Sequence, residues 1–72
     1  MKIEYDSLAD AAFIWFVSDP QQAAKDGLTE VWPRELDDHV GLLLASDKRL
    51  LGIEVLFASA TLPQGFLAAV GS

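Results

Sequence analysis

Two segments of this chain are apolar at nearly every position, residues 11–17 (AAFIWFV) and residues 50–57 (LLGIEVLF). A strand with one exposed face alternates polar and apolar residues, whereas a continuous apolar run is typical of a strand covered on both faces. A chain of 72 residues has little left to cover a second face. The pattern therefore predicts a sheet that is completed by a partner, most simply another copy of the same chain.

Two shorter segments show the alternation of a half-exposed strand. Residues 2–5 place Ile3 and Tyr5 on one side and predict a first, edge-like strand. Residues 28–34 alternate as well, but they contain Pro33. Because proline lacks an amide donor, this strand is expected at an edge of the sheet or to end early.

The clearest local prediction is an antiparallel hairpin. Residues 40–45 (VGLLLA) and residues 50–57 flank the short polar turn 46–49 (SDKR). By contrast, residues 18–27 are polar and contain Pro20, and we expect an irregular connection with one helical turn at QQAAK.

A short helix is predicted near the end of the chain. Pro63 favours its start, Phe66, Leu67 and Val70 fall on one helical face, and Gly71 predicts its stop. Two turns of helix cover only part of one sheet face, so we expect this segment to close one face and a second protomer to close the other.

These elements predict a single domain, residues 1–72, that is mainly β within the α+β class. The expected architecture is a small twisted antiparallel β-meander of about four or five strands with a short C-terminal helical segment. A helix over residues 8–16 is the competing interpretation, but the aromatic and β-branched residues of that segment favour a strand.

Charge and composition narrow the function classes. Eleven acidic and five basic residues give a net charge of −6, and the basic residues never cluster beyond a pair, which argues against nucleic-acid binding. The acidic balance suits a basic protein partner such as a toxin, although it also keeps a chain that is 51% hydrophobic in solution, and we favour the latter interpretation. Without cysteine, a signal peptide or a long apolar run, we expect a soluble cytoplasmic protein with no membrane partner.

Three short segments carry a resemblance to a known family: YD at 5–6, ADA at 9–11 and GIEVLFAS at 52–59. In order and spacing they resemble the small bacterial proteins grouped as domain-of-unknown-function family 2283, over Lys2 to Ser59. That pattern opens with a Y-D-x-x-x-D-A-like stretch and closes with a G-I-E-I-L-D-A-S-like strand, so Phe57 stands where an acidic residue is common. The resemblance implies a compact, mostly β domain, and it implies no established activity, cofactor or substrate.

Carboxylates are the main candidates for chemistry. Asp6 and Asp10 bracket a turn, where two carboxylates could serve a divalent cation or an acid/base pair; we favour the interpretation that Asp6 shapes the turn and Asp10 caps its far end. Asp37, Asp38 and His39 form the single His-carboxylate cluster of the sequence. Adjacent residues of an extended chain point apart, which favours a solvated acidic turn over a metal site.

Glu54 interrupts an apolar strand. Strict alternation places it on the face shared with Leu50 and Leu56. Because a buried unpaired carboxylate is costly, we expect it to pair with Arg34 or Arg49, to lie at a dimer seam, or to line the rim of a pocket.

The leading hypothesis is a noncatalytic, homodimeric protein-interaction module, without catalytic residues, cofactor or bound metal. Trp15 is expected in the core, and Trp32, beside a proline on an alternating strand, is the better interface candidate. The alternative is a carboxylate-dependent enzyme, or a small-ligand or metal-binding protein, that uses Asp6, Asp10 and Glu54 and includes His39. Carboxylates converging on a concave pocket favour that alternative. The full set of interface candidates is Phe13, Trp15, Trp32, Leu50 and Leu56.

Overall fold

The computed structural model describes residues 1–70, which form one antiparallel sheet with short helices at its ends. Its strands are β1 (Lys2–Asp6), β2 (Ala11–Trp15), β3 (Leu28–Val31), β4 (Val40–Ala45) and β5 (Leu50–Leu56). The helices are α1 (Pro20–Ala23), the 3-10 turn η1 (Arg34–Leu36), α2 (Ala58–Thr61) and α3 (Phe66–Val70). Within the described part of the chain, no helix is long and apolar enough to cross a membrane.

The predicted fold class is confirmed, and each predicted strand is present. Strand β2 ends at Trp15, although the amide of Phe16 still donates to the carbonyl of Leu51 (2.8 Å). Strand β3 ends before Pro33 and lies at an edge, as the missing amide donor predicts. The predicted C-terminal helix is α3; the predicted positions of the Val70 side chain and of Gly71 lie outside what the structure describes.

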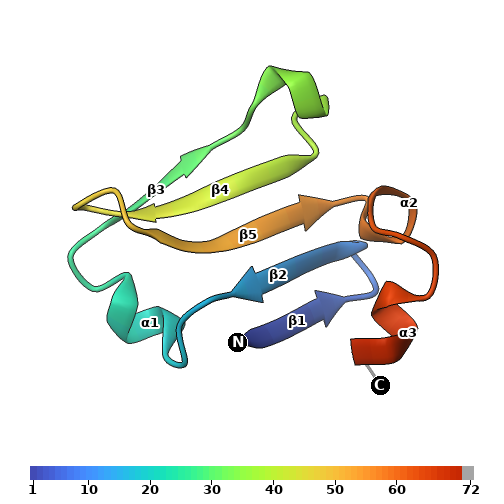
Figure 1. Ribbon diagram of the computed structural model, residues 1–72, viewed down its shortest axis with the longest axis horizontal. Helices are drawn as coiled ribbons and strands as arrows, with labels where there is room; N and C mark the ends of the chain where they lie inside the picture. The colour runs from blue at the N-terminus through green and yellow to red at the C-terminus, as the bar shows by residue number, and fades with distance from the viewer. Residues whose placement is uncertain (71–72) are drawn as a thin grey trace.

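Strand order is β1-β2-β5-β4-β3, so the sheet joins two runs of consecutive strands (Figure 1). Strands β1 and β2 form one hairpin, and β3, β4 and β5 form a three-stranded meander. The two runs meet where β2 pairs with β5, from Ala11 opposite Leu56 to Trp15 opposite Gly52. In a meander running unbroken through the whole chain, β3 would lie beside β2; here the most apolar strands, β2 and β5, are neighbours at the centre.

One side of the sheet is a continuous uncharged surface. The strand register aligns a row of aliphatic side chains across all the strands: Ile3, Ile14, Ile53, Leu42 and Val31. The described strand positions on this side, which we call the aliphatic face, carry no charged residue: the other members are Tyr5, Ala12, Thr29, Val40, Leu44 and Val55, with Leu50 and Leu51 at the irregular start of β5.

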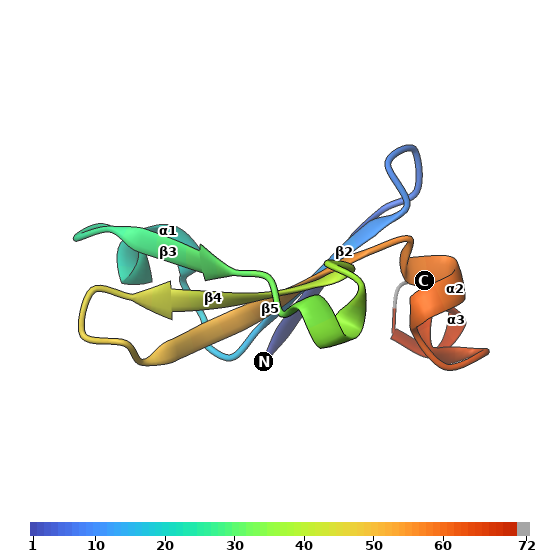
Figure 2. The ribbon, with the colours of Figure 1, turned by 90° about the horizontal axis from the view of Figure 1, so that it is seen from above.

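The C-terminal segment covers only one end of the aliphatic face. Leu62 and Leu67 pack against a buried cluster of Ala12, Val55 and Ala58. Seen from above, α2 and α3 gather at one end of the twisted sheet (Figure 2). Two turns of helix thus cover part of one face, as expected, but the expectation that this segment closes that face is wrong, because the rest of the aliphatic row remains half-buried or exposed.

The opposite side, which we call the tryptophan face, carries Phe13, Trp15, Trp32, Leu43 and Glu54, together with Glu4 and Glu30. Each indole ring lies close to a glycine. A Cβ at Gly41 would come within 2.7 Å of the Trp32 ring, and a Cβ at Gly52 within 3.0 Å of the Trp15 ring. The buried Leu43 pairs with Gly52, so the absence of side chains at the glycines lets the large rings cover the centre of this face.

Leu50 does not follow the alternation expected of β5. The β4–β5 register is irregular between Leu43 and Leu44, and Leu50 pairs with Leu44. The alternation that would put Leu50 beside Glu54 is interrupted there, because the irregularity shifts the phase of the pleat. The prediction that Leu50 shares the face of Glu54 is therefore corrected.

We expect Gly52→Ala to destabilise the protein by about 1–3 kcal/mol, because its Cβ would lie 2.6 Å from the carbonyl oxygen of Ile14, and a backbone atom of the neighbouring strand cannot move aside. Urea unfolding followed by tryptophan fluorescence measures this loss. The matched variant Gly41→Ala meets only the Trp32 side chain, which can rotate away, so it should cost less. Equal stability of Gly52→Ala and the parent would contradict the close approach of β2 and β5.

Candidate functional site

The most densely hydrogen-bonded side chain of the described residues is Asp10. Its Oδ1 accepts from the Tyr5 hydroxyl at 2.7 Å and from the Ser59 amide at 3.0 Å, and its Oδ2 accepts from the Ser59 hydroxyl at 2.7 Å. Its carbonyl oxygen also accepts from the Ala58 amide at 2.8 Å. Asp10 therefore ties the β1–β2 turn to the junction between β5 and α2.

Hydrogen bonding also sets the ionisation of this group. The Ser59 hydroxyl, and then the Tyr5 hydroxyl, lower the pKa of Asp10, because both bonds favour the charged carboxylate. The hydrogen bond between Tyr5 and Asp10 also raises the pKa of Tyr5, since the phenol must keep its proton to donate. Both oxygens of Asp10 therefore accept hydrogen bonds from the chain itself, which gives this side chain a structural role.

Asp6 shapes the turn, as we favoured from the sequence. Its Oδ1 accepts from the amides of Leu8 (3.0 Å) and Ala9 (3.3 Å), the pattern of an Asx turn. Asp6 and Asp10 thus each serve local backbone geometry.

The Asp37–His39 cluster forms a turn as well. Asp37 and Asp38 have φ angles of +53° and +57°, a left-handed conformation that aspartate tolerates. The His39 ring packs on Phe57 with centroids 4.9 Å apart. Over residues 1–70, no group of three or more His, Asp or Glu side chains is arranged to hold a metal ion.

Glu54 lies on the tryptophan face, in the row that contains Gly41 and Phe13. Burial, and then the negative charge of Glu30, raise the pKa of its carboxyl group. Of the three alternatives considered for Glu54, the ion pair with Arg34 or Arg49 does not form; Arg49 lies 3.2 Å from Asp47 instead. The other ion pair among the described residues joins Lys2 to Glu4 at 3.7 Å.

Both tryptophans are oriented by carboxylates. The indole nitrogen of Trp15 donates to Glu4 (3.0 Å), and that of Trp32 donates to Glu30 (3.2 Å). Phe13 stacks on Trp15 with ring centroids 5.8 Å apart and planes 5° from parallel. Trp15, expected in the core, is half-buried on this face, so the indole rings remain accessible. Of the interface candidates, four lie on the tryptophan face: Phe13, Trp15, Trp32 and Leu56.

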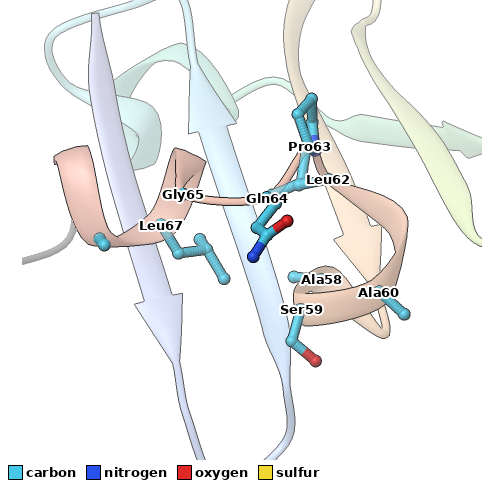
Figure 3. Close-up of a pocket in the computed structure, with 9 residues that line it drawn as sticks. Ala58, Ser59, Ala60, Leu62, Pro63, Gln64, Gly65 and Leu67 are labelled. Atoms are coloured by element: carbon cyan, nitrogen blue, oxygen red, sulfur yellow. The ribbon is translucent and has the colours of Figure 1, made fainter.

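A hollow of about 580 Å³ lies between α2 and α3 (Figure 3). Its polar side chains are Ser59, which already donates to Asp10, and Gln64. No titratable side chain lines it, so the candidate carboxylates do not converge there.

Comparison with known proteins supplies the family. The sequence profile of a family described as "Protein of unknown function (DUF2283)" matches residues 2–59. The chain belongs to this family. No curated protein and no solved structure matches the chain. In this member of DUF2283, the Tyr5, Asp10 and Ser59 positions that carry the resemblance meet in one hydrogen-bonded cluster, which gives these positions a structural role.

Phe57, the departure from the DUF2283 pattern, also has a backbone explanation. Its φ is +51°, in the left-handed region that Asn and Asp adopt more readily than other non-glycine residues. An acidic residue at this position suits the sharp entry into α2, which Phe57 leaves without a side-chain cap. The family preference therefore needs no catalytic aspartate to account for it.

The Asp10 cluster predicts a defined pH dependence. Because hydrogen bonds lower the folded-state pKa below 3.8, their stabilisation is present above pH 3.8 and is lost as the pH falls through the lower folded-state value. Asp10→Asn should lower the urea midpoint at neutral pH, and its deficit should shrink in that acidic window. Asp38→Asn, at an exposed aspartate that also has positive φ, is the matched control and should stay close to the parent.

The backbone at residue 57 can be tested with two variants that both remove the ring. Phe57→Asn should be more stable than Phe57→Ala by about 1 kcal/mol, because asparagine tolerates the left-handed conformation. Urea unfolding of the pair gives this difference directly. Equal midpoints would show that residue 57 is not held at positive φ in solution.

Proposed function

We propose that this chain is a noncatalytic protein-interaction module that works as a homodimer joined through the uncovered part of the aliphatic face. The observation that supports the proposal most is the aliphatic row across all strands, Ile3, Ile14, Ile53, Leu42 and Val31. The C-terminal segment of the chain covers the end of the aliphatic face around Val55. At the other end of this face, Val31 is 42% exposed.

The exposed area supports association. The chain exposes 5042 Å², compared with about 4,400 Å² expected for a compact monomer of its mass. Its radius of gyration, 12.3 Å, also exceeds the roughly 11 Å expected for its length. The molecule measures 34 × 28 × 18 Å. The area of its broad side is therefore comparable with the roughly 800 Å² that each partner contributes to a standard interface.

Charge favours the aliphatic face over the tryptophan face as the dimer contact. In a two-fold dimer the same surface meets itself, so each side chain approaches copies of its neighbours. Pairing of the tryptophan face would bring together the carboxylates of Glu30 and Glu54, which repel one another and lose solvation, whereas Glu4 is paired with Lys2 on the same face. The aliphatic face carries no such penalty, and apolar burial contributes about 25 cal/mol per Å².

The hydrogen bonding of the candidate carboxylates supports a noncatalytic role. The Asp10 carboxylate accepts three hydrogen bonds, and the Asp6 carboxylate accepts two from backbone amides, all from the same chain. Glu54 lies on the tryptophan face, whereas Asp10 binds the start of α2, so these residues serve separate parts of the fold.

Sedimentation equilibrium of two matched variants tests the dimer. Val31 and Leu28 lie on the same edge strand with 42% and 40% exposure, but on opposite faces of the sheet. We expect a dimer at micromolar concentration. Val31→Lys should raise the dissociation constant of the dimer at least about tenfold, because the new ammonium groups would be buried at the contact. Leu28→Lys adds the same charge and should leave the dimer intact.

Two results would contradict the proposal. A folded monomer at micromolar concentration would exclude self-association in this range. A dimer weakened by Leu28→Lys and insensitive to Val31→Lys would assign the contact to the tryptophan face instead.

A further inference from the structure

The tryptophan face surrounds an acidic group with aromatic rings. The strand register places Glu54 beside Phe13 on one side and Gly41 on the other, and the Trp32 ring covers Gly41. Two positions along β5, the Trp15 ring covers Gly52. Paired positions across a sheet are separated by about 5 Å between Cβ atoms, so these rings are within reach of the Glu54 side chain.

The carboxylates of this face differ in whether they accept a hydrogen bond from the chain itself. Glu4 and Glu30 accept the indole N–H groups of Trp15 and Trp32 and hold the two rings in place. The hydrogen bonds and ion pairs of the described residues leave Glu54 without a partner. Its charge is half-buried, is close to that of Glu30, and is therefore less screened than a charge in open solvent.

We propose that the tryptophan face binds an arginine-bearing segment of a basic protein, with the guanidinium group paired to the Glu54 carboxylate and stacked on the Trp32 ring. Guanidinium is the cation that combines two-pronged hydrogen bonding to a carboxylate with stacking on an aromatic face. The net charge of −6 attracts such a partner from a distance. This proposal rests on the interaction role but not on the dimer, since it uses the opposite face.

Calorimetric titration with three short peptides tests the chemistry. They share one Gly-Ser sequence and carry three arginines, three lysines or three citrullines, so that charge and guanidinium shape are separated. We expect the arginine peptide to give a binding isotherm. In NMR spectra it should also shift the indole N–H resonances of Trp15 and Trp32. The lysine peptide should bind several-fold more weakly, and the neutral citrulline peptide should not bind.

Two acidic variants locate the site. Glu54→Gln should weaken the arginine peptide at least about tenfold, because it removes the charge and keeps the shape. Glu35→Gln, an exposed residue of η1, changes the net charge equally and should leave binding unchanged. Trp32→Leu is a second variant that removes the stacking surface and should also reduce binding.

The outcomes separate this proposal from the dimer. Equal losses in Glu54→Gln and Glu35→Gln, equal affinity for the arginine and lysine peptides, or no binding of the arginine peptide would each overturn it. Binding retained by Val31→Lys would support a site independent of self-association. Binding lost in Val31→Lys and kept in Leu28→Lys would place the peptide on the aliphatic face and overturn it as well.

Discussion

A five-stranded sheet has two broad faces, and this chain has one short segment with which to cover them. That segment, α2 and α3, reaches only the end of the aliphatic face where Ala12 and Val55 lie. Asp10 fixes the start of α2 by binding Ser59, so the small core depends on one carboxylate that joins residues 49 positions apart. The remaining surface of the sheet is left to its own side chains.

The two faces meet this constraint in different ways. On the tryptophan face, glycines at positions 41 and 52 leave room for the indole rings close to the sheet, and Leu43, which pairs with Gly52, is buried. On the aliphatic face, branched side chains stand above the sheet and leave their outer surfaces uncovered. The first face is suited to a polar ligand that stacks on rings, and the second is suited to another apolar surface.

Local sequence patterns predicted the elements well, because alternation and turn residues act over a few positions. The five strands, the turn at Asp6 and the early end of the strand before Pro33 all follow from such patterns. The pairing of β2 with β5 could not be derived in this way, since it depends on contacts between distant segments. The same limit hid Ser59 as the partner of Asp10, and the register irregularity that moves Leu50 out of phase with Glu54.

The carboxylates of the tryptophan face also bear on the size of any assembly. If both faces of this open sheet were uncharged, each could pack on another copy, and the chain could stack without limit. Glu30 and Glu54 make self-association through the tryptophan face unfavourable, because like charges would be buried together. Association restricted to the aliphatic face closes after two copies. A dimer of this kind presents its tryptophan faces outward on both sides, where each remains available to a basic partner.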